Sequence, residues 1–155
     1  IASNWEGATI KIESQAYQST QFTVESDWSG ASYWFSLLAC ADEGSFFLEG
    51  LKPQSLQGDA AIVEIMAQLG VKSSFQEGGV LLEKQAVIGL KEWDFSHCPD
   101  LAQTVAVTCA ILGQNTVFRG LESYESRKPT ESMPCSRNWQ SLTLNYGRSH
   151  QTLFR

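Results

Sequence analysis

The chain repeats one pattern three times: an aspartate, apolar residues at helical spacing, a glycine, and a short run typical of a strand. The aspartates are Asp27, Asp59 and Asp100, and the glycines are Gly44, Gly70 and Gly113. Acidic residues favour helix starts and glycine favours helix ends, so a cap-and-stop arrangement explains all three copies. The pattern predicts helices over residues 29–43, 59–69 and 100–112.

Each predicted helix has an apolar stripe. The stripes consist of Trp34, Leu37, Leu38 and Ala41; Ile62, Ile65, Met66 and Leu69; and Ala102, Val105, Ala106 and Cys109. Strands are predicted in ATIKIE, QFTVES, SFFLEGL, VKSSFQEGG, GVLLEK, residues 87–90, residues 91–95 and TVFRGL. Helices apolar on one side need a sheet to cover. We therefore predict an α/β (α+β) fold of repeated strand-helix units, with the helices on one face of a mixed sheet and parallel strands flanking each helix.

Composition narrows the class of protein. With 155 residues, of which 43% are hydrophobic, the chain can bury one sizeable core. It contains no apolar run near the roughly 20 residues of a membrane helix, and no signal-like start, so we predict no membrane partner and a cytoplasmic location. Residues 1–123 carry 6 basic and 15 acidic groups, a net charge of −9, which argues against nucleic-acid binding.

The cysteines do not suggest a metal site. Cys40, Cys98, Cys109 and Cys135 lie far apart, and only two histidines accompany them. Zinc sites need closely spaced ligands, so buried free thiols are the preferred interpretation. We expect no metal and no cofactor.

Asp100 is the candidate catalytic residue. Pro99 disfavours helical geometry at Cys98, so the extended run ends there and Asp100 enters the first turn of the third helix. Unpaired N–H groups and the helix dipole favour an ionised carboxylate at this position. Capping is the commoner role for such a residue, and a catalytic base is the alternative that this stretch leaves open.

Residues 124–155 differ from the rest of the chain. They contain no Ala, Val or Ile, and no helical or alternating stripe. At the other end, the chain begins at Ile1 without a methionine or a capped element. We interpret this start as a cut edge of a longer chain, and vector or processing effects are the alternative.

The strings FTVESDWSGASYWFSLLA, GLKPQSLQGD, IMAQLGV and CPDLAQTVAV together resemble one family, 5-enolpyruvylshikimate-3-phosphate (EPSP) synthase. The resemblance covers about residues 8–123 and corresponds to the middle third of the family. It implies a two-domain fold in which each domain contains three helix-and-sheet units. Residues 1–26 would end the first domain and include the crossover, and residues 27–123 would be part of the second.

The same resemblance implies an activity. The family transfers the enolpyruvyl group of phosphoenolpyruvate to the 5-hydroxyl of shikimate 3-phosphate, a carboxyvinyl transfer in chorismate and aromatic amino acid biosynthesis. Asp100 corresponds to the family aspartate that contacts the shikimate substrate and shuttles its hydroxyl proton. A positioned carboxylate suits a reaction in which an alcohol loses a proton and a methylene gains one. A cap and a base are compatible roles.

Residues 1–123 lack the cationic groups that two anionic substrates need, so we expect the fragment to be inactive alone. A family asparagine falls at Ser123, which leaves that substrate contact in doubt. A Lys-Glu-Thr-Asp-Arg motif should begin where residues 124–155 begin. Permitted codons for residues 124–132, read in another frame, encode Arg-Ile-Lys-Glu-Thr-Asp-Arg-Ile, so we hypothesise that this tail is out of frame.

Two other functions stay open. One is the related enolpyruvyl transferase acting on UDP-N-acetylglucosamine, although CPDLAQTVAV and SLQGD resemble the shikimate branch better. The other is a noncatalytic folding or partner-binding module. A fragment of a two-domain protein exposes former interface, and we therefore expect possible self-association.

Overall fold

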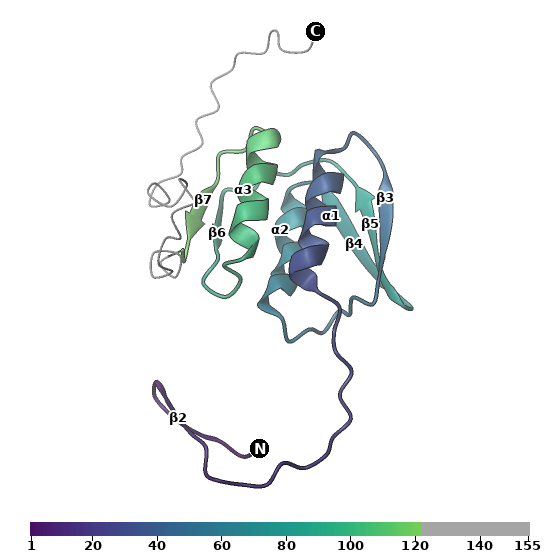
Figure 1. Ribbon diagram of the computed structural model, residues 1–155. Coiled ribbons are helices and arrows are strands. Elements are labelled where there is room, and N and C mark those ends of the chain that lie inside the picture. Colours follow the sequence, from purple (N-terminus) through teal and green to yellow (C-terminus); the bar gives the residue numbers. More distant parts are fainter. Residues whose placement is uncertain (122–155) are drawn as a thin grey trace, which may run out of the picture.

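Three α-helices form in residues 1–121, the part of the chain that this computed structural model describes (Figure 1). They are α1 (Trp28–Cys40), α2 (Ile62–Gln68), which follows the short 3-10 helix η1 (Gly58–Ala61), and α3 (Leu101–Ile111). All three predicted helices are confirmed to within a few residues. The strands are β1 (Asn4–Glu6), β2 (Thr9–Lys11), β3 (Ser45–Glu49), β4 (Val71–Gln76), β5 (Gly79–Lys84), β6 (Glu92–Asp94) and β7 (Val117–Arg119).

The helix ends follow from local chemistry. α1 stops at Cys40, three residues before the predicted end, because Asp42 and Glu43 would place carboxylates at the negative end of its dipole. Gly70 and Gly113 have φ of 93° and 64°, which confirms the predicted glycine stops. The expected side-chain caps at Asp27 and Asp59 are wrong, since neither α1 nor η1 has a capping hydrogen bond from a side chain.

The strands form three small sheets instead of one. In the largest sheet, β3 and β4 each pair antiparallel with the central strand β5. β3 and β4 therefore run parallel to each other. In the sequence, β3 precedes α2 and β4 follows it. β6 and β7 flank α3 in the sequence and pair directly in parallel. The α/β class and the parallel flanking strands of α2 and α3 are thus confirmed. β1 and β2 form a separate antiparallel hairpin.

Two predicted strands are wrong. Residues 21–26 and 87–90 form no strand, so no strand precedes α1 to run parallel with β3. Phe22 and Val24 alternate as a strand would, yet their side chains are 71% and 82% exposed. Alternation favours a strand only where a neighbouring strand and a covering layer exist.

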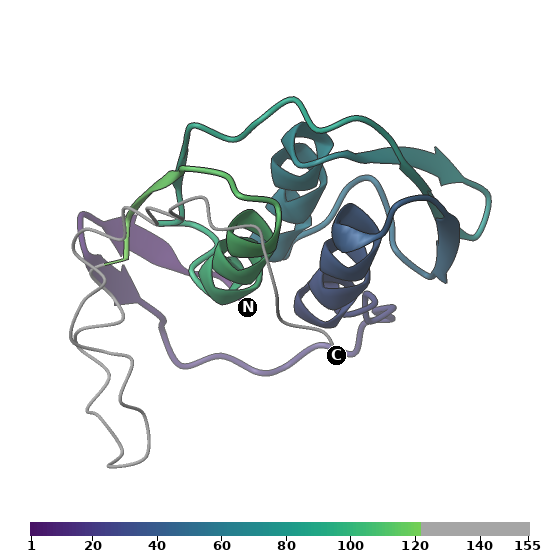
Figure 2. The ribbon, with the colours of Figure 1, turned by 90° about the horizontal axis from the view of Figure 1, so that it is seen from above.

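The elements lie in layers around one core. α1 and α2 lie beside the three-stranded sheet, α3 lies next to α1, and the β6–β7 pair lies beyond α3 (Figures 1 and 2). The buried cluster draws on every layer, from Val80 and Leu82 of β5 to Phe95 after β6. Phe95 also stacks on Phe118 of β7, with ring centroids 5.0 Å apart. Such side chains each stabilise the fold by about 1.5–3 kcal/mol when buried.

The predicted stripes are confirmed for α2 and α3, whose stripe residues are all buried. The stripe of α1 is mostly wrong: Trp34 and Leu37 are 50% and 55% exposed, and only Leu38 of its four residues is fully buried. The buried face consists of Trp28, Ala31, Ser32, Phe35, Leu38 and Ala39. Since α1 contains no charged residue, its sequence has no polar face from which the buried side can be inferred.

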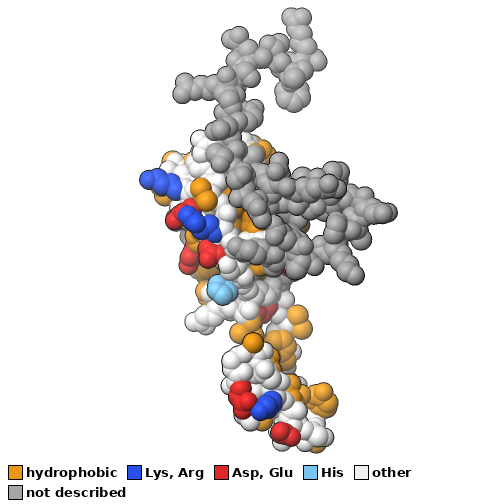
Figure 3. All heavy atoms as spheres, turned by 90° about the vertical axis from the view of Figure 1, so that its left-hand side faces the viewer, with side chains coloured by type: hydrophobic (Ala, Val, Ile, Leu, Met, Phe, Trp, Pro, Cys, Tyr) orange, Lys and Arg blue, Asp and Glu red, His pale blue; other side chains and the backbone are white. Residues whose placement is uncertain are grey.

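Residues 1–24 stand apart from the layers. Every one of them is exposed, and in Figure 3 they extend below the body of the molecule with apolar and charged side chains on their surface.

None of the helices in residues 1–121 has the length and apolar character needed to cross a bilayer. The predictions made for residues 124–155 lie outside the described residues.

Candidate active site at the start of α3

A ladder of hydroxyl groups aligns α1 with α3. Ser36 Oγ lies 2.7 Å from Thr108 Oγ1, and Ser32 Oγ lies 3.4 Å from Thr104 Oγ1. Both pairs are 72 residues apart in the sequence, so the two helices run parallel and in register. The same offset sets Asp100 opposite Trp28, and both helices therefore begin at the same end of the molecule.

The segment before α2 reaches the same end. Ser29 Oγ donates a hydrogen bond to the buried carboxylate of Asp59. Gly58 packs so closely against the carbonyl oxygen of His97 that no side chain fits there. Figure 1 shows the three helices rising from this shared end. Helix N-termini carry partial positive charge, and the carboxylates of Asp27, Asp59 and Asp100 lie at this same end.

Asp100 lies exposed at the N-terminal boundary of α3. It makes no capping hydrogen bond to the helix, because a tight turn satisfies the first backbone groups instead. Leu101 N–H donates to the carbonyl oxygen of Cys98 at 3.1 Å, and Ala102 N–H donates to that of Pro99 at 3.0 Å. The structure therefore does not use the Asp100 carboxylate as a helix cap.

The loop that leads to Asp100 is held by Asp94. Its Oδ1 accepts hydrogen bonds from Ser96 Oγ at 2.6 Å and from Ser96 N–H at 2.9 Å. These two bonds lower the pKa of the Asp94 carboxyl, with smaller contributions from the charges of His97 and Arg119. Gly120 lies against this turn and leaves no room for a side chain. The approach to Asp100 is thus fixed by short polar contacts.

A second carboxylate anchors the entry into α1. Glu25 accepts hydrogen bonds from Ser55 Oγ, from Leu56 N–H at 3.0 Å and from Gln57 Nε2 at 3.4 Å. Gln57 Nε2 also donates to the Ser26 carbonyl oxygen, and its Oε1 accepts from Trp28 N–H, both within 3.0 Å. The bond from Ser55, followed by that from Leu56, lowers the pKa of Glu25. This network joins the start of α1 to the loop before η1.

Cationic side chains are few. Residues 1–121 contain six lysines and arginines against fourteen aspartates and glutamates. Three of the six form exposed ion pairs, Lys11 with Glu6, Lys72 with Glu83 and Arg119 with Glu92. Lys84 instead donates to the carbonyl oxygen of Ala39. Little positive side-chain charge is therefore left in residues 1–121 to bind anions.

The three described cysteines are free thiols, as predicted. Cys98 and Cys109 are buried and Cys40 is partly buried, and burial raises the pKa of all three. Burial of this kind disfavours the thiolate, which is the reactive form of the side chain. Within residues 1–121 no group of three His, Cys, Asp or Glu side chains is placed to hold a metal ion.

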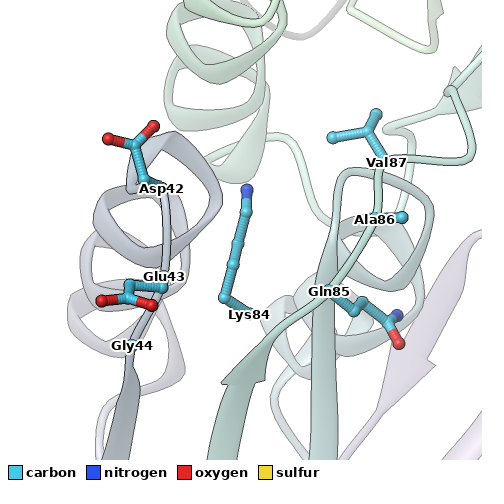
Figure 4. A pocket seen from close by; sticks show the side chains of 7 residues that line it. All are labelled: Asp42, Glu43, Gly44, Lys84, Gln85, Ala86 and Val87. Carbon is cyan, nitrogen blue, oxygen red and sulfur yellow. The ribbon is translucent and has the colours of Figure 1, made fainter.

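A pocket of about 380 Å³ lies at the opposite end of α1 from Asp100, between the end of α1 and the end of β5 (Figure 4). Lys84 extends into it and the carboxylates of Asp42 and Glu43 point away from the lysine. Because Lys84 is bonded to a carbonyl group of the last turn of α1, it stabilises the negative end of that helix. We assign this pocket no role in the candidate active site.

The sequence offered Asp100 as a candidate but did not predict the side-chain contacts that join the elements around the start of α3. Ser32 and Ser36 are four residues apart, as are Thr104 and Thr108, and hydroxyl groups at this spacing on two apolar helices signal a polar helix-helix contact. No comparable pattern in the sequence indicates the hydrogen bond from Ser29 to Asp59 or the network of Glu25 and Gln57. Both join residues about 30 positions apart.

Comparison with known proteins identifies one family, both by its family model and by individual relatives. The family model described as EPSP synthase (3-phosphoshikimate 1-carboxyvinyltransferase) matches residues 1–131. A 3-phosphoshikimate 1-carboxyvinyltransferase of Bacteroides fragilis is 41% identical over 120 residues, covering 77% of this chain and 29% of the relative. Enzymes of that name from Methanothrix thermoacetophila and Methanospirillum hungatei are 40% and 34% identical over 109 and 107 residues. These cover 70% and 68% of this chain, and 25% of each relative.

The chain thus spans less than a third of the length of these curated relatives. The family match, in contrast, includes every residue that the structure describes and most of the chain. We conclude that the chain belongs to the EPSP synthase family.

Proposed function

We propose that this chain forms part of a transferase that moves the enolpyruvyl group of phosphoenolpyruvate to the 5-hydroxyl of shikimate 3-phosphate. Asp100 is the proposed catalytic residue and also contacts the shikimate substrate. The observation that carries this proposal is the position of Asp100, at the end where α1 and α3 begin in register. Residues 1–26 belong to the end of one domain and the crossover, and residues 27–123 to part of the next.

The chemistry supports this role for Asp100. In the addition step the hydroxyl oxygen bonds to C2 of phosphoenolpyruvate while the hydroxyl group loses its proton and the methylene carbon gains one. In the elimination step the new methyl group loses a proton, phosphate leaves and the double bond is restored. A single carboxylate can perform such proton transfers in turn. Asp100 lies at the start of α3, where the helix dipole places partial positive charge. The same field attracts the phosphate and carboxylate groups of both substrates.

The chain alone is proposed to be inactive. Its described residues have more than twice as many acidic as basic groups, and electrostatic stabilisation is usually the largest catalytic contribution. Purified chain incubated with phosphoenolpyruvate and shikimate 3-phosphate should release no measurable phosphate. Turnover that copurifies with the chain and disappears in Asp100→Ala would contradict this proposal.

The role of Asp100 needs an active background. We suggest replacing the matched 120-residue segment of the Bacteroides fragilis enzyme with the corresponding residues of this chain. Asp100→Asn should then lower kcat by about 10²–10⁴-fold, the range typical of a lost acid-base group, with the fold retained. Asp42→Asn is the matched control, since Asp42 is also an exposed aspartate but lies at the far end of α1. Equal activity in the two variants would refute the assignment.

Ligand binding can test whether the chain belongs to the branch of the family that acts on shikimate 3-phosphate or to the one that acts on UDP-N-acetylglucosamine. Shikimate 3-phosphate should bind the active chimera and UDP-N-acetylglucosamine should not, as measured by titration calorimetry. The relatives named above all carry the shikimate name, which supports this branch. A cytoplasmic location and the absence of nucleic-acid partners are part of the same proposal.

A further inference from the structure

Asp59 is a buried carboxylate among the elements that meet at the start of α3. It lies in η1 and is only 9% exposed, although most aspartates lie at protein surfaces. It takes part in none of the three ion pairs within residues 1–121. Burying a charge costs free energy unless polar partners compensate for it. The contacts of Asp59 indicate what this buried carboxylate does.

On one side, η1 is fixed to the first turn of α1. Ser29 Oγ donates a hydrogen bond to the Asp59 carboxylate, and Trp28 N–H donates to Gln57 Oε1 at 3.0 Å. The two bonds therefore lie on either side of Gly58 in the sequence. Because Trp28 is 1% exposed and belongs to the buried core, α1 gives η1 a firm support.

On its other side, η1 contacts the turn that leads to Asp100. Gly58 packs directly against the backbone carbonyl group of His97. Burial raises the pKa of the Cys98 thiol, and the nearby charge of Asp59 raises it further, so the Asp59 carboxylate also lies close to this turn. Asp100 comes two residues after Cys98. The segment η1 therefore touches the backbone that determines where the Asp100 carboxylate lies.

We propose that Asp59 is a positioning residue for Asp100: it holds η1 on α1, and η1 holds the turn that carries the Asp100 carboxylate. The inference rests on the proposed catalytic role of Asp100. A displacement of about 1 Å in a reacting group can lower the rate by about 10²-fold, so a contact that prevents it contributes to catalysis. Asp59 acts through the backbone and needs no contact with a substrate.

Amide hydrogen exchange, measured by NMR on the full 155-residue chain, tests this contact without any activity. Leu101 N–H and Ala102 N–H report on the turn, because they donate its hydrogen bonds to the carbonyl oxygens before α3. Asp59→Ala should speed their exchange by about tenfold, as expected when a typical hydrogen bond is lost. Asp59→Asn should preserve the slow exchange, since its amide oxygen still accepts a hydrogen bond from Ser29.

Thr116→Val is the matched control. Thr116 is also a buried polar residue, and its Oγ1 donates to the carbonyl oxygen of Leu90 at 2.6 Å. It lies 3.4 Å from Cys109 Sγ, near the end of α3 that is remote from Asp100. The control thus loses a buried hydrogen bond without touching the turn, and exchange of the same two amides should stay unchanged.

The active chimera described above tests the catalytic consequence. Asp59→Ala should lower kcat by up to about 10²-fold while the KM values for both substrates stay nearly unchanged. Asp59→Asn should restore most of this loss, and Thr116→Val should keep kcat. Ser29→Ala removes only the donor and should lower kcat to a smaller extent. It also provides a test if circular dichroism shows that Asp59→Ala does not fold.

Unchanged exchange or unchanged kcat in both Asp59→Ala and Ser29→Ala would overturn the inference. Equal losses in Thr116→Val, or a loss that Asp59→Asn does not restore, would overturn it as well. Failure of the proposed function looks different, since Asp100→Asn would then keep full activity in the same chimera. If Asp100→Asn loses activity and Asp59→Ala keeps it, only the positioning role is wrong.

Discussion

Residues 1–24 and residues 28–121 use apolar side chains to very different effect. Trp5, Ile10 and Phe22 are all exposed in the first region, whereas Phe35 and Ile65 of the second are fully buried. The first region forms only two strands of three residues each, joined as a hairpin. An isolated two-stranded hairpin is at best marginally stable in water. Apolar content alone therefore does not create a core, because each element needs a second layer to cover it.

The largest expected difference between the regions concerns a matched pair of phenylalanines. Phe35→Ala should lower the free energy of unfolding by about 3–5 kcal/mol, because it leaves a cavity in the core. Phe22→Ala should change it by less than about 0.5 kcal/mol, since Phe22 is largely exposed. Urea denaturation of both variants measures the contrast. Comparable losses would mean that residues 1–24 also pack on the body.

Gly58→Ala tests the close contact of η1 with the loop before α3. A methyl group there would press against the backbone carbonyl of His97, which cannot rotate away as a side chain could. We expect a loss of about 1–3 kcal/mol in unfolding free energy, the usual cost of overpacking. An unchanged urea midpoint would show that the loop moves easily and that the shared end of the helices is less rigid than the structure indicates.

The hydroxyl ladder between α1 and α3 should contribute less to the free energy of unfolding than the close contact at Gly58. Thr108 Oγ1 donates to the carbonyl oxygen of Thr104, so Ser36 supplies the proton in the Ser36–Thr108 contact. Ser36→Ala should cost about 1 kcal/mol, as for a typical hydrogen bond. A double-mutant cycle with Thr108→Val should give a coupling energy of the same order. Strict additivity would mean that the two hydroxyl groups do not interact in solution.

The Glu25 network should make stability depend on pH. Because the pKa of Glu25 in the folded chain is below its ordinary value of 4.5, its contribution is present above about pH 4.5. It is lost as the pH falls through the lower folded pKa. Glu25→Gln should therefore flatten the stability profile below pH 4.5 and leave its shape at neutral pH unchanged. Identical profiles for both proteins would exclude this network as a source of the pH dependence.

The smallest effect should come from removing residues 1–24. This deletion keeps Glu25 and α1, and it removes only exposed residues, so the unfolding free energy should change by less than about 1 kcal/mol. A thermal melt of the shortened chain checks this. Loss of the cooperative transition would show that the hairpin of β1 and β2 belongs to the same folding unit as residues 28–121.

The sequence predicted the helices well because each signal was local. Ile62, Ile65 and Met66 recur at helical spacing, and Gly70 ends the pattern at a positive φ of 93°. The buried side of α1 could not be predicted, since that helix lacks charges to mark its exposed side. The division of the strands into three sheets depends on pairing between distant residues, which periodicity does not encode.

The candidate site was predictable only in part. The motif around Asp100 indicated the residue and its place at the start of a helix, but not the absence of a cap. That absence depends on the turn from Cys98 to Ala102, in which backbone groups satisfy one another. The contacts of Ser29 with Asp59 and of Ser36 with Thr108 bring together segments that are distant in the sequence. The out-of-frame origin of residues 124–155 stays a prediction, which sequencing of the encoding DNA tests.

The separation of 72 residues between the partners of the hydroxyl ladder has a consequence for the order of folding. β4 and β5 are joined by a turn at Gly78, so their pairing closes a very short loop and can form within microseconds. The contact of α1 with α3 closes a much longer loop and must wait for the intervening units. We expect Leu82→Ala in β5 to slow refolding, and Thr108→Val mainly to accelerate unfolding. Stopped-flow measurements that gave the opposite pattern would show that the two helices meet first.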